Sequence, residues 1–150
     1  MKNKTTLAQM VAFQKHGCQL YGGRPYSYHL TMVVDKVNFL YGESPKLKLL
    51  QQIAWLHDVV EDTDTTITYL SDCGFSPEVL FAVGSISKIK GESLSDYYDR
   101  VANSKLAFKV KVADTLSNLE HSLREGVVKR INKYTNQLQE LYKRKEKQSC

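Results

Sequence analysis

The stretch LLQQIAWLHDVVED, residues 49–62, joins an apolar helical pattern to a cluster of histidine and acidic side chains. Its apolar residues recur at intervals of three and four, the spacing of one buried helix face, at Leu49, Leu50, Ile53, Ala54 and Leu56. Similar spacing is found almost throughout the chain, for example in residues 7–11 and 30–37. We therefore expect an all-α fold.

Capping residues and glycines predict where the helices begin and end. Ser44-Pro45 and Ser76-Pro77 each place a capping hydroxyl before a proline at the first helical position. Gly17, Gly42 and Gly74 fall where helices should stop. These signals predict helices over residues 6–16, 26–40, 46–60, 65–73, 77–88, 94–103, 105–121 and 127–146.

Residues 17–24, GCQLYGGR, have no helical periodicity and contain two adjacent glycines, so they predict a loop. Loops of this kind often carry ligand contacts. The chain shows no internal repeat and no break in composition. We expect residues 1–150 to form one domain.

The composition is that of an ordinary water-soluble domain. The chain has 150 residues, 42% hydrophobic and 25% charged, which is close to the average for globular proteins. Its uncharged stretches, such as residues 49–56 and 79–87, are far shorter than the ~18 residues that a membrane-spanning helix requires. We expect no membrane partner.

The distribution of charge argues against a nucleic-acid-binding protein, and the cysteines argue against a zinc-ribbon or redox protein. Residues 143–147, KRKEK, carry four of the positive charges and one negative charge, so they account for +3 of the net charge of +5. We interpret them as the start of a frayed basic tail from about residue 143, and nucleic acid is not an expected partner. Cys18, Cys73 and Cys150 are odd in number and show no metal-binding or redox spacing, which favours a reduced, cytoplasmic setting.

The segment His57–Asp62, HDVVED, carries the clearest chemical signal. On one helix, residues 57 and 61 stack one turn apart, as do residues 58 and 62, so one imidazole and three carboxylates share a stripe. Adjacent acids repel one another, and a helix tolerates such a cluster when a cation neutralises it. The nitrogen of His57 and the oxygen of Asp58 suit manganese, iron or zinc.

A metal bound there needs further ligands, and two candidates stand out. His29 follows PYSY at residues 25–28, and Asp114 lies in the otherwise apolar stretch 110–116, where an unpartnered buried carboxylate is costly. Taken singly, His29 also fits a surface or hydrogen-bonded histidine, and Asp114 fits an acid on a helix surface.

Other polar and aromatic residues have simpler interpretations. His16 and His121 are not expected to bind metal. Helically spaced tyrosines at 97, 98, 134 and 142 are interpreted as packing residues. Next to a metal-bound water, Glu61 or Asp62 would orient the water or carry its proton.

The ordered set His29, His57-Asp58 and Asp114 resembles the H…HD…D signature of the HD-domain metal-dependent phosphohydrolases. More narrowly, HDVVEDT at 57–63 is similar to the hydrolase motif of the RelA/SpoT family. Three flanking segments also resemble that family: PYSYH at 25–29, KVADTLSNL at 111–119 and SKIKGESLSDYYDRVANS at 87–104. The resemblance covers roughly residues 7–135.

This resemblance implies a single HD-domain helical bundle that removes the 3′-pyrophosphate of guanosine 3′,5′-bis(diphosphate). It implies Mn²⁺ as the cofactor, held by His29, His57, Asp58 and Asp114. It also implies Glu61 and Asp62 as the catalytic acids. Substrate contacts are expected from Asn118, Lys111 and Arg24.

The chain departs from the family pattern on the side that reads the base. The family commonly has an arginine nine residues before the first histidine ligand, where this chain has Leu20, with Arg24 four residues later. Thr115 and His121 replace a further arginine and a small residue. Three functions therefore stay open: hydrolysis of the guanosine bis(diphosphate), hydrolysis of a deoxynucleotide or nicotinamide dinucleotide phosphate, and nucleotide binding without turnover. The retained acids favour an enzyme.

Overall fold

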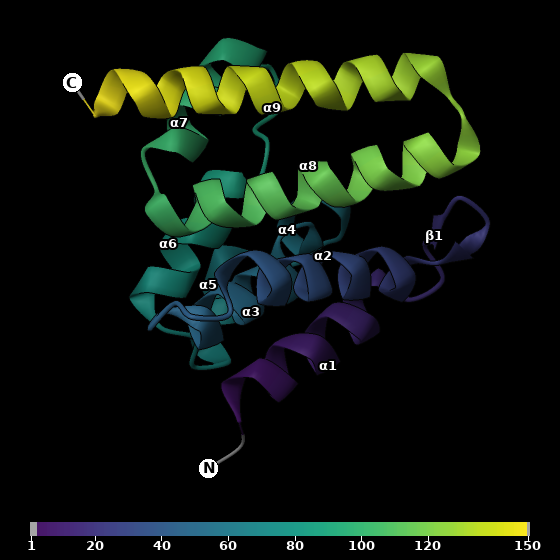
Figure 1. Cartoon of the computed structure of the whole chain (residues 1–150). Helices are drawn as coiled ribbons and strands as arrows, with labels where there is room; N and C mark the ends of the chain where they lie inside the picture. The colour runs from purple at the N-terminus through teal and green to yellow at the C-terminus, as the bar shows by residue number, and fades with distance from the viewer. Residues whose placement is uncertain (1–2, 150) are drawn as a thin grey trace.

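A computed structural model describes residues 3–149 (Figure 1). Nearly all of the regular structure is helical, which confirms the expected all-α fold, and one short hairpin is the exception. The helices are α1 Lys4–His16, α2 Tyr26–Tyr41, α3 Leu47–Leu56, α4 Val59–Asp62, α5 Ile67–Asp72, α6 Pro77–Ile86, α7 Leu94–Ala102, α8 Lys105–Glu125 and α9 Val128–Gln148. The strands are β1 Leu20–Tyr21 and β2 Arg24–Pro25.

The helices pack in layers along the long helix α8. Figure 1 shows α9 lying alongside α8, with α2 and α3 on the other side of α8 and α1 below them. The larger core lies between α1, α2, α3, α6 and α8, and contains the fully buried Leu30, Leu50 and Ile53. A second core, around Tyr97 and Leu141, holds α7 and α9 against α8.

Serine side chains start three of the helices as capping chemistry predicts. The hydroxyls of Ser76, Ser93 and Ser104 each accept a hydrogen bond from the backbone N–H three residues later. The long helix α8 ends at Glu125 and is followed by Gly126, whose φ of 67° lies in the left-handed region that favours glycine. The chain can therefore reverse and run back along α8 as α9.

The helix expected over residues 46–60 ends earlier, at Leu56. His57 and Asp58 form a turn, and α4 follows it with four residues. The Nδ1–H group of His57 donates to the carbonyl of Ala54 at 2.7 Å, because a carbonyl oxygen only accepts. This side chain thus satisfies a carbonyl of the last turn of α3, where the helix ends.

The predicted loop at residues 17–24 contains the hairpin of β1 and β2. Leu20 pairs with Pro25 and Tyr21 with Arg24, in antiparallel register. Gly22 and Gly23 form the turn with φ values of 54° and 80°, which residues other than glycine rarely adopt. Adjacent glycines are a known hairpin signal, so the sequence contained the information that predicts this turn.

The basic residues 143–147 belong to α9, and the expected frayed tail is not found among the residues that the structure describes. Helix α9 continues to Gln148. Arg144 donates to Asp99 at 2.7 Å and to Glu140 at 2.6 Å, and Leu141 is fully buried one turn earlier. Packing against α7 therefore continues the helix through the charged run.

Two statements from composition concern the cysteines and the membrane. Cys18 and Cys73 carry free thiols, and Cys150 lies outside the described residues. Among residues 3–149, no helix combines the length and the apolar character needed to cross a membrane.

Candidate metal centre

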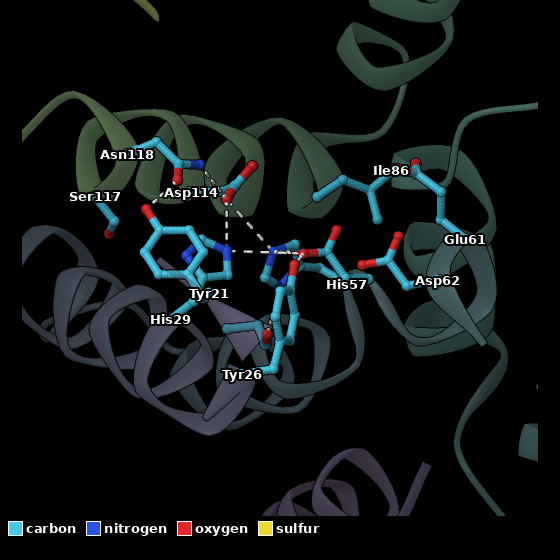
Figure 2. A network of polar contacts seen from close by, with 12 residues as sticks. Tyr21, Tyr26, His29, His57, Glu61, Asp62, Ile86, Asp114, Ser117 and Asn118 are labelled. Atoms are coloured by element: carbon cyan, nitrogen blue, oxygen red, sulfur yellow. Dashed lines mark hydrogen bonds and ion pairs between the residues drawn. The ribbon is translucent and has the colours of Figure 1, made fainter. Parts of the chain in front are cut away.

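Three segments far apart in the sequence place the predicted ligands together. His29 comes from the first turn of α2, His57 and Asp58 from the turn between α3 and α4, and Asp114 from the middle of α8. One ligand atom from each of His29, His57 and Asp114 lies within 4.8 Å of the others, and all three residues are buried (Figure 2). The proximity predicted for these residues is confirmed.

Asp58 lies beside this group. Its Oδ2 atom is 3.0 Å from Nε2 of His57 and 3.7 Å from Nε2 of His29. Oδ1 of Asp114 is 3.1 Å from Nε2 of His29 and 3.5 Å from Nε2 of His57. Two imidazole nitrogens therefore face two carboxylate oxygens across one small space.

The chemistry of this donor set fits a divalent metal ion. Since Nδ1 of His57 carries the hydrogen donated to Ala54, the neutral ring presents the lone pair of Nε2. This Nε2 atom is buried and makes no hydrogen bond with the described part of the chain, although Oδ2 of Asp58 is 3.0 Å away. Two nitrogen and two carboxylate oxygen donors match what manganese, iron or zinc accepts.

The charges of the group also favour a cation. Burial raises the pKa of Asp114, but the adjacent Lys111 and the imidazoles of His29 and His57 lower it further, so its pKa falls well below the usual range. Burial lowers the pKa of His57, but Asp58 and Asp114 more than offset this, so the pKa of His57 rises well above its usual value. The two carboxylates stay ionised and attract positive charge to the space between the ligands.

Further side chains orient the carboxylates. The hydroxyl of Tyr26 donates to Oδ2 of Asp58 at 2.5 Å, and burial and the charge of Asp58 raise the pKa of this tyrosine, which keeps its proton. Lys111 donates to Oδ2 of Asp114 at 2.9 Å, and the side-chain amide of Asn118 donates to Oδ1 of Asp114 at 3.0 Å. Such contacts fix the direction in which ligands point.

Glu61 and Asp62 belong to α4, lie next to the candidate ligands and are exposed to solvent (Figure 2). Each acid has one oxygen held by a hydrogen-bond donor. The backbone N–H of Lys88 donates to Oε1 of Glu61 at 2.8 Å, and the side-chain amide of Gln19 donates to Oδ2 of Asp62 at 3.1 Å. No donor within residues 3–149 bonds the second oxygen of either acid, so that oxygen is available to a bound molecule.

Both acids and three of the four expected metal ligands line a cavity of about 240 Å³. Its wall also carries the lysines Lys88, Lys111 and Lys133. A hollow of about 410 Å³ beside Phe108 and Lys145 is larger, but no histidine or carboxylate lines it. The side-chain chemistry, and not the size, therefore identifies the candidate site.

Comparison with known proteins supports the fold. No family model matches the chain, and no curated protein matches it. Among solved structures, the chain is similar to a metazoan ortholog of SpoT that hydrolyses ppGpp and plays a role in starvation responses. The two share 24% sequence identity with a TM-score of 0.76, over 96% of this chain and 86% of that chain. The chain has the HD-domain fold.

Within this HD-domain fold, two of the residues expected to contact substrate lie in the cavity and one does not. Lys111 and Asn118 line the cavity and also contact Asp114. The guanidinium of Arg24 lies over the ring of Tyr28, 4.5 Å from its centroid, and is not part of the cavity wall.

Several residues of the HD-domain cavity were not predicted from the sequence. Tyr21 and Tyr26 reach it from either side of the hairpin turn, and Tyr21 donates to Oδ1 of Asn118 at 2.7 Å. Helix α9 adds Lys133, Tyr134 and Gln137. The interpretation of Tyr134 as a packing residue was therefore incomplete. The glycine pair pointed to the hairpin, but no local signal placed α9 beside the ligands.

Proposed function

We propose that this chain is a metal-dependent phosphohydrolase that removes the 3′-pyrophosphate of guanosine 3′,5′-bis(diphosphate). The observation that carries the proposal is the convergence of a buried histidine and aspartate cluster with two solvent-exposed acids in one lysine-lined cavity. The shared fold with a hydrolase of ppGpp supports the choice of substrate. A soluble nucleotide as substrate and the free thiols of Cys18 and Cys73 favour a cytoplasmic enzyme.

The residues divide the work as follows. His29, His57, Asp58 and Asp114 would hold one divalent ion, and Mn²⁺ suits their mixed nitrogen and oxygen donors. Such an ion, when bound, supplies Lewis acidity toward a phosphoryl oxygen and activates water. Lys88, Lys111 and Lys133 neutralise and orient the phosphates at the cavity wall.

Glu61 and Asp62 handle the proton of the attacking water. The oxygen of each acid that accepts no protein hydrogen bond faces the reaction, and the other oxygen is anchored by Lys88 or Gln19. Water attacks the phosphorus that is bonded to the 3′-oxygen. The bond between this phosphorus and the 3′-oxygen then breaks. Pyrophosphate leaves, and the ribose 3′-oxygen takes up a proton.

A second candidate substrate is another nucleotide phosphate, such as a deoxynucleotide or a nicotinamide dinucleotide phosphate. It is favoured by the placement of Leu20 and Arg24, since Leu20 is exposed and neither residue lines the cavity. Within the part of the chain that the structure describes, the cavity wall contains no arginine that could bind guanine. The exposed Glu61 and Asp62 weigh against a binding protein without turnover, because binding alone does not require these acids.

The decisive experiment incubates Mn²⁺-loaded protein with a panel of guanine, adenine, deoxynucleotide and nicotinamide dinucleotide phosphates. Chromatography of the products then separates pyrophosphate from orthophosphate. Release of pyrophosphate from guanosine 3′,5′-bis(diphosphate) supports the main proposal. Release of orthophosphate from another nucleotide supports the second candidate. No turnover of any compound would contradict both.

A further inference from the structure

The side chain of Gln19 connects helix α1 to the acid Asp62 on α4. Its Oε1 atom lies 2.8 Å from Nδ1 of His16, the last residue of α1. Its Nε2 atom lies 3.1 Å from Oδ2 of Asp62. Neither His16 nor Gln19 is part of the metal cluster or of the cavity wall.

Hydrogen-bond chemistry decides which atom donates and which accepts in each of these two contacts. An ionised carboxylate only accepts, so the amide nitrogen of Gln19 faces Asp62 and its oxygen faces His16. Nδ1 of His16 must then carry a hydrogen to bond this oxygen. The donors run from His16 through Gln19 and end on Oδ2 of Asp62.

Backbone hydrogen bonds and ring stacking hold Gln19 and His16 in place, so they can orient Asp62. The backbone N–H of Gln19 donates to the carbonyl of His16 at 2.9 Å, and its carbonyl accepts from the N–H of Tyr26 at 3.0 Å. The ring of His16 is 6% exposed and stacks on the ring of Tyr26 with centroids 4.6 Å apart. Tyr26 in turn donates to Asp58.

We propose that His16 and Gln19 are positioning residues that hold the carboxylate of Asp62 in its working orientation. The proposal rests on the proposed function, in which Asp62 carries the proton of water. An exposed carboxylate on the short helix α4 otherwise rotates freely, and its reactive oxygen then spends less time beside the water. Gln19 prevents this for Asp62, as the backbone N–H of Lys88 does for Glu61.

The first test replaces Gln19 by methionine, which keeps the length of the side chain and removes both hydrogen bonds. For Gln19→Met we expect a kcat about 10- to 100-fold lower, with KM and Mn²⁺ content unchanged, since loss of a supporting contact typically costs this much. Gln51→Met is the matched control, because the amide of Gln51 bonds Asn38 at 2.8 Å away from the cavity. An unchanged kcat in Gln19→Met would overturn the proposal.

The second test separates the hydrogen bond of His16 from its packing. His16→Phe keeps an aromatic ring against Tyr26 but has no donor, whereas the amide of His16→Asn can replace Nδ1–H. We expect the kcat of His16→Phe to fall as in Gln19→Met, and that of His16→Asn to recover by at least several-fold. Equal kcat values for the two variants would show a packing role only.

A third measurement is independent of turnover. In the ¹⁵N spectrum of histidine-labelled protein without metal, we expect His16 to carry its hydrogen on Nδ1, and Gln19→Met to change that signal. A ring of His16 that carries its hydrogen on Nε2 alone would overturn the proposed hydrogen bond to Gln19, even in an active enzyme. Absence of turnover in the wild-type protein would instead overturn the proposed function, and with it the positioning role of His16 and Gln19 in catalysis. The spectrum would still decide whether the hydrogen bonds of His16 and Gln19 exist.

Discussion

The two ring nitrogens of His57 have separate tasks. Nδ1 donates to the carbonyl of Ala54 and thereby sets both the tautomer and the end of α3. Nε2 faces Asp58 and Asp114 without a hydrogen-bond partner of its own. The contact made at the end of the helix therefore leaves Nε2 free to act as a ligand in the proposed metal site, which links the local backbone to the chemistry of the site.

Replacing Asp58 by alanine should abolish metal binding and turnover. The variant removes one of two carboxylate donors and leaves the hydroxyl of Tyr26 without its acceptor. Metal content after gel filtration and the rate of pyrophosphate release measure the effect. Asp64→Ala is the matched control, because the side chain of Asp64 is 90% exposed and lies outside the cluster. Full metal content in Asp58→Ala would exclude Asp58 as a ligand.

The acids on α4 should behave differently from the ligands. Glu61→Gln and Asp62→Asn keep the shape of the side chains, so metal content should not change. Turnover should fall by ~100-fold or more, because a general acid or base is lost. Parallel measurements of metal content and kcat distinguish the two effects. If both variants lose the metal, these residues are ligands instead.

The sequence predicted that His29, His57 and Asp114 lie close together, because these residues are chemically out of place in their local surroundings. His57-Asp58 follows an apolar run, and Asp114 interrupts another, so each required a partner. The aromatic residues Tyr21 and Tyr26 have no such signal, because a tyrosine fits a core as well as a cavity. The position of Arg24 outside the cavity wall could not be read from the sequence, because it depends on how the hairpin is placed against the helices.

At the scale of elements, the loop between α6 and α7 brings a backbone N–H to Glu61 and is organised by one arginine. Arg100 donates to the carbonyls of Gly84, Ser85 and Ser87 and to the carboxylate of Glu92. These acceptors lie at the end of α6 and in the following loop, which carries Lys88. A planar guanidinium can satisfy several acceptors at once, and a lysine ammonium cannot reproduce this geometry.

Arg100→Lys should therefore destabilise the protein while keeping the charge. We expect the free energy of unfolding to fall by about 1–2 kcal/mol, because backbone carbonyls lose their donor in a partly exposed place. We also expect a lower kcat, since the N–H of Lys88 is then held less firmly against Glu61. Urea titration and steady-state kinetics measure the two effects. Arg124→Lys, at an exposed arginine, provides the control. Equal stability of Arg100→Lys and wild type would contradict this role.

Most helix boundaries were predictable because capping and glycine signals are local. Ser76 caps α6 as expected, and α8 ends later than expected, at Glu125. Ser44 does not cap α3, which begins at Leu47 without a side-chain cap. The two clearer failures have tertiary or side-chain causes. The basic end of α9 stays helical because Arg144 reaches Asp99, which is distant in the sequence. At the break after Leu56, the side chain of His57 bonds a carbonyl of the last turn of α3, a contact that helical periodicity does not predict.

At the scale of the whole molecule, the ligand group ties together three elements that span most of the chain. His29 is on α2, His57 follows α3, and Asp114 is on α8, and these three helices pack against one another in the larger core. A metal bound at the proposed site would stabilise the folded state, because the unfolded chain does not bring these residues together. Thermal stability is therefore a readout of the site that needs no substrate.

The increase in melting temperature produced by Mn²⁺ should grow with pH between about 6 and 8. In the metal-free folded protein, Asp58 and Asp114 raise the pKa of His57 well above the unfolded value. This group therefore stabilises the metal-free fold fully below about pH 6.5, and the contribution is lost as pH rises through the folded pKa. The metal needs the lone pair that the proton occupies, so it competes with the proton at low pH and binds more tightly as pH rises. Melting curves with and without Mn²⁺ at several pH values measure the difference. Arg124→Lys, which leaves the cluster intact, should show the same trend, and a metal effect that does not vary with pH would exclude His57 as a ligand.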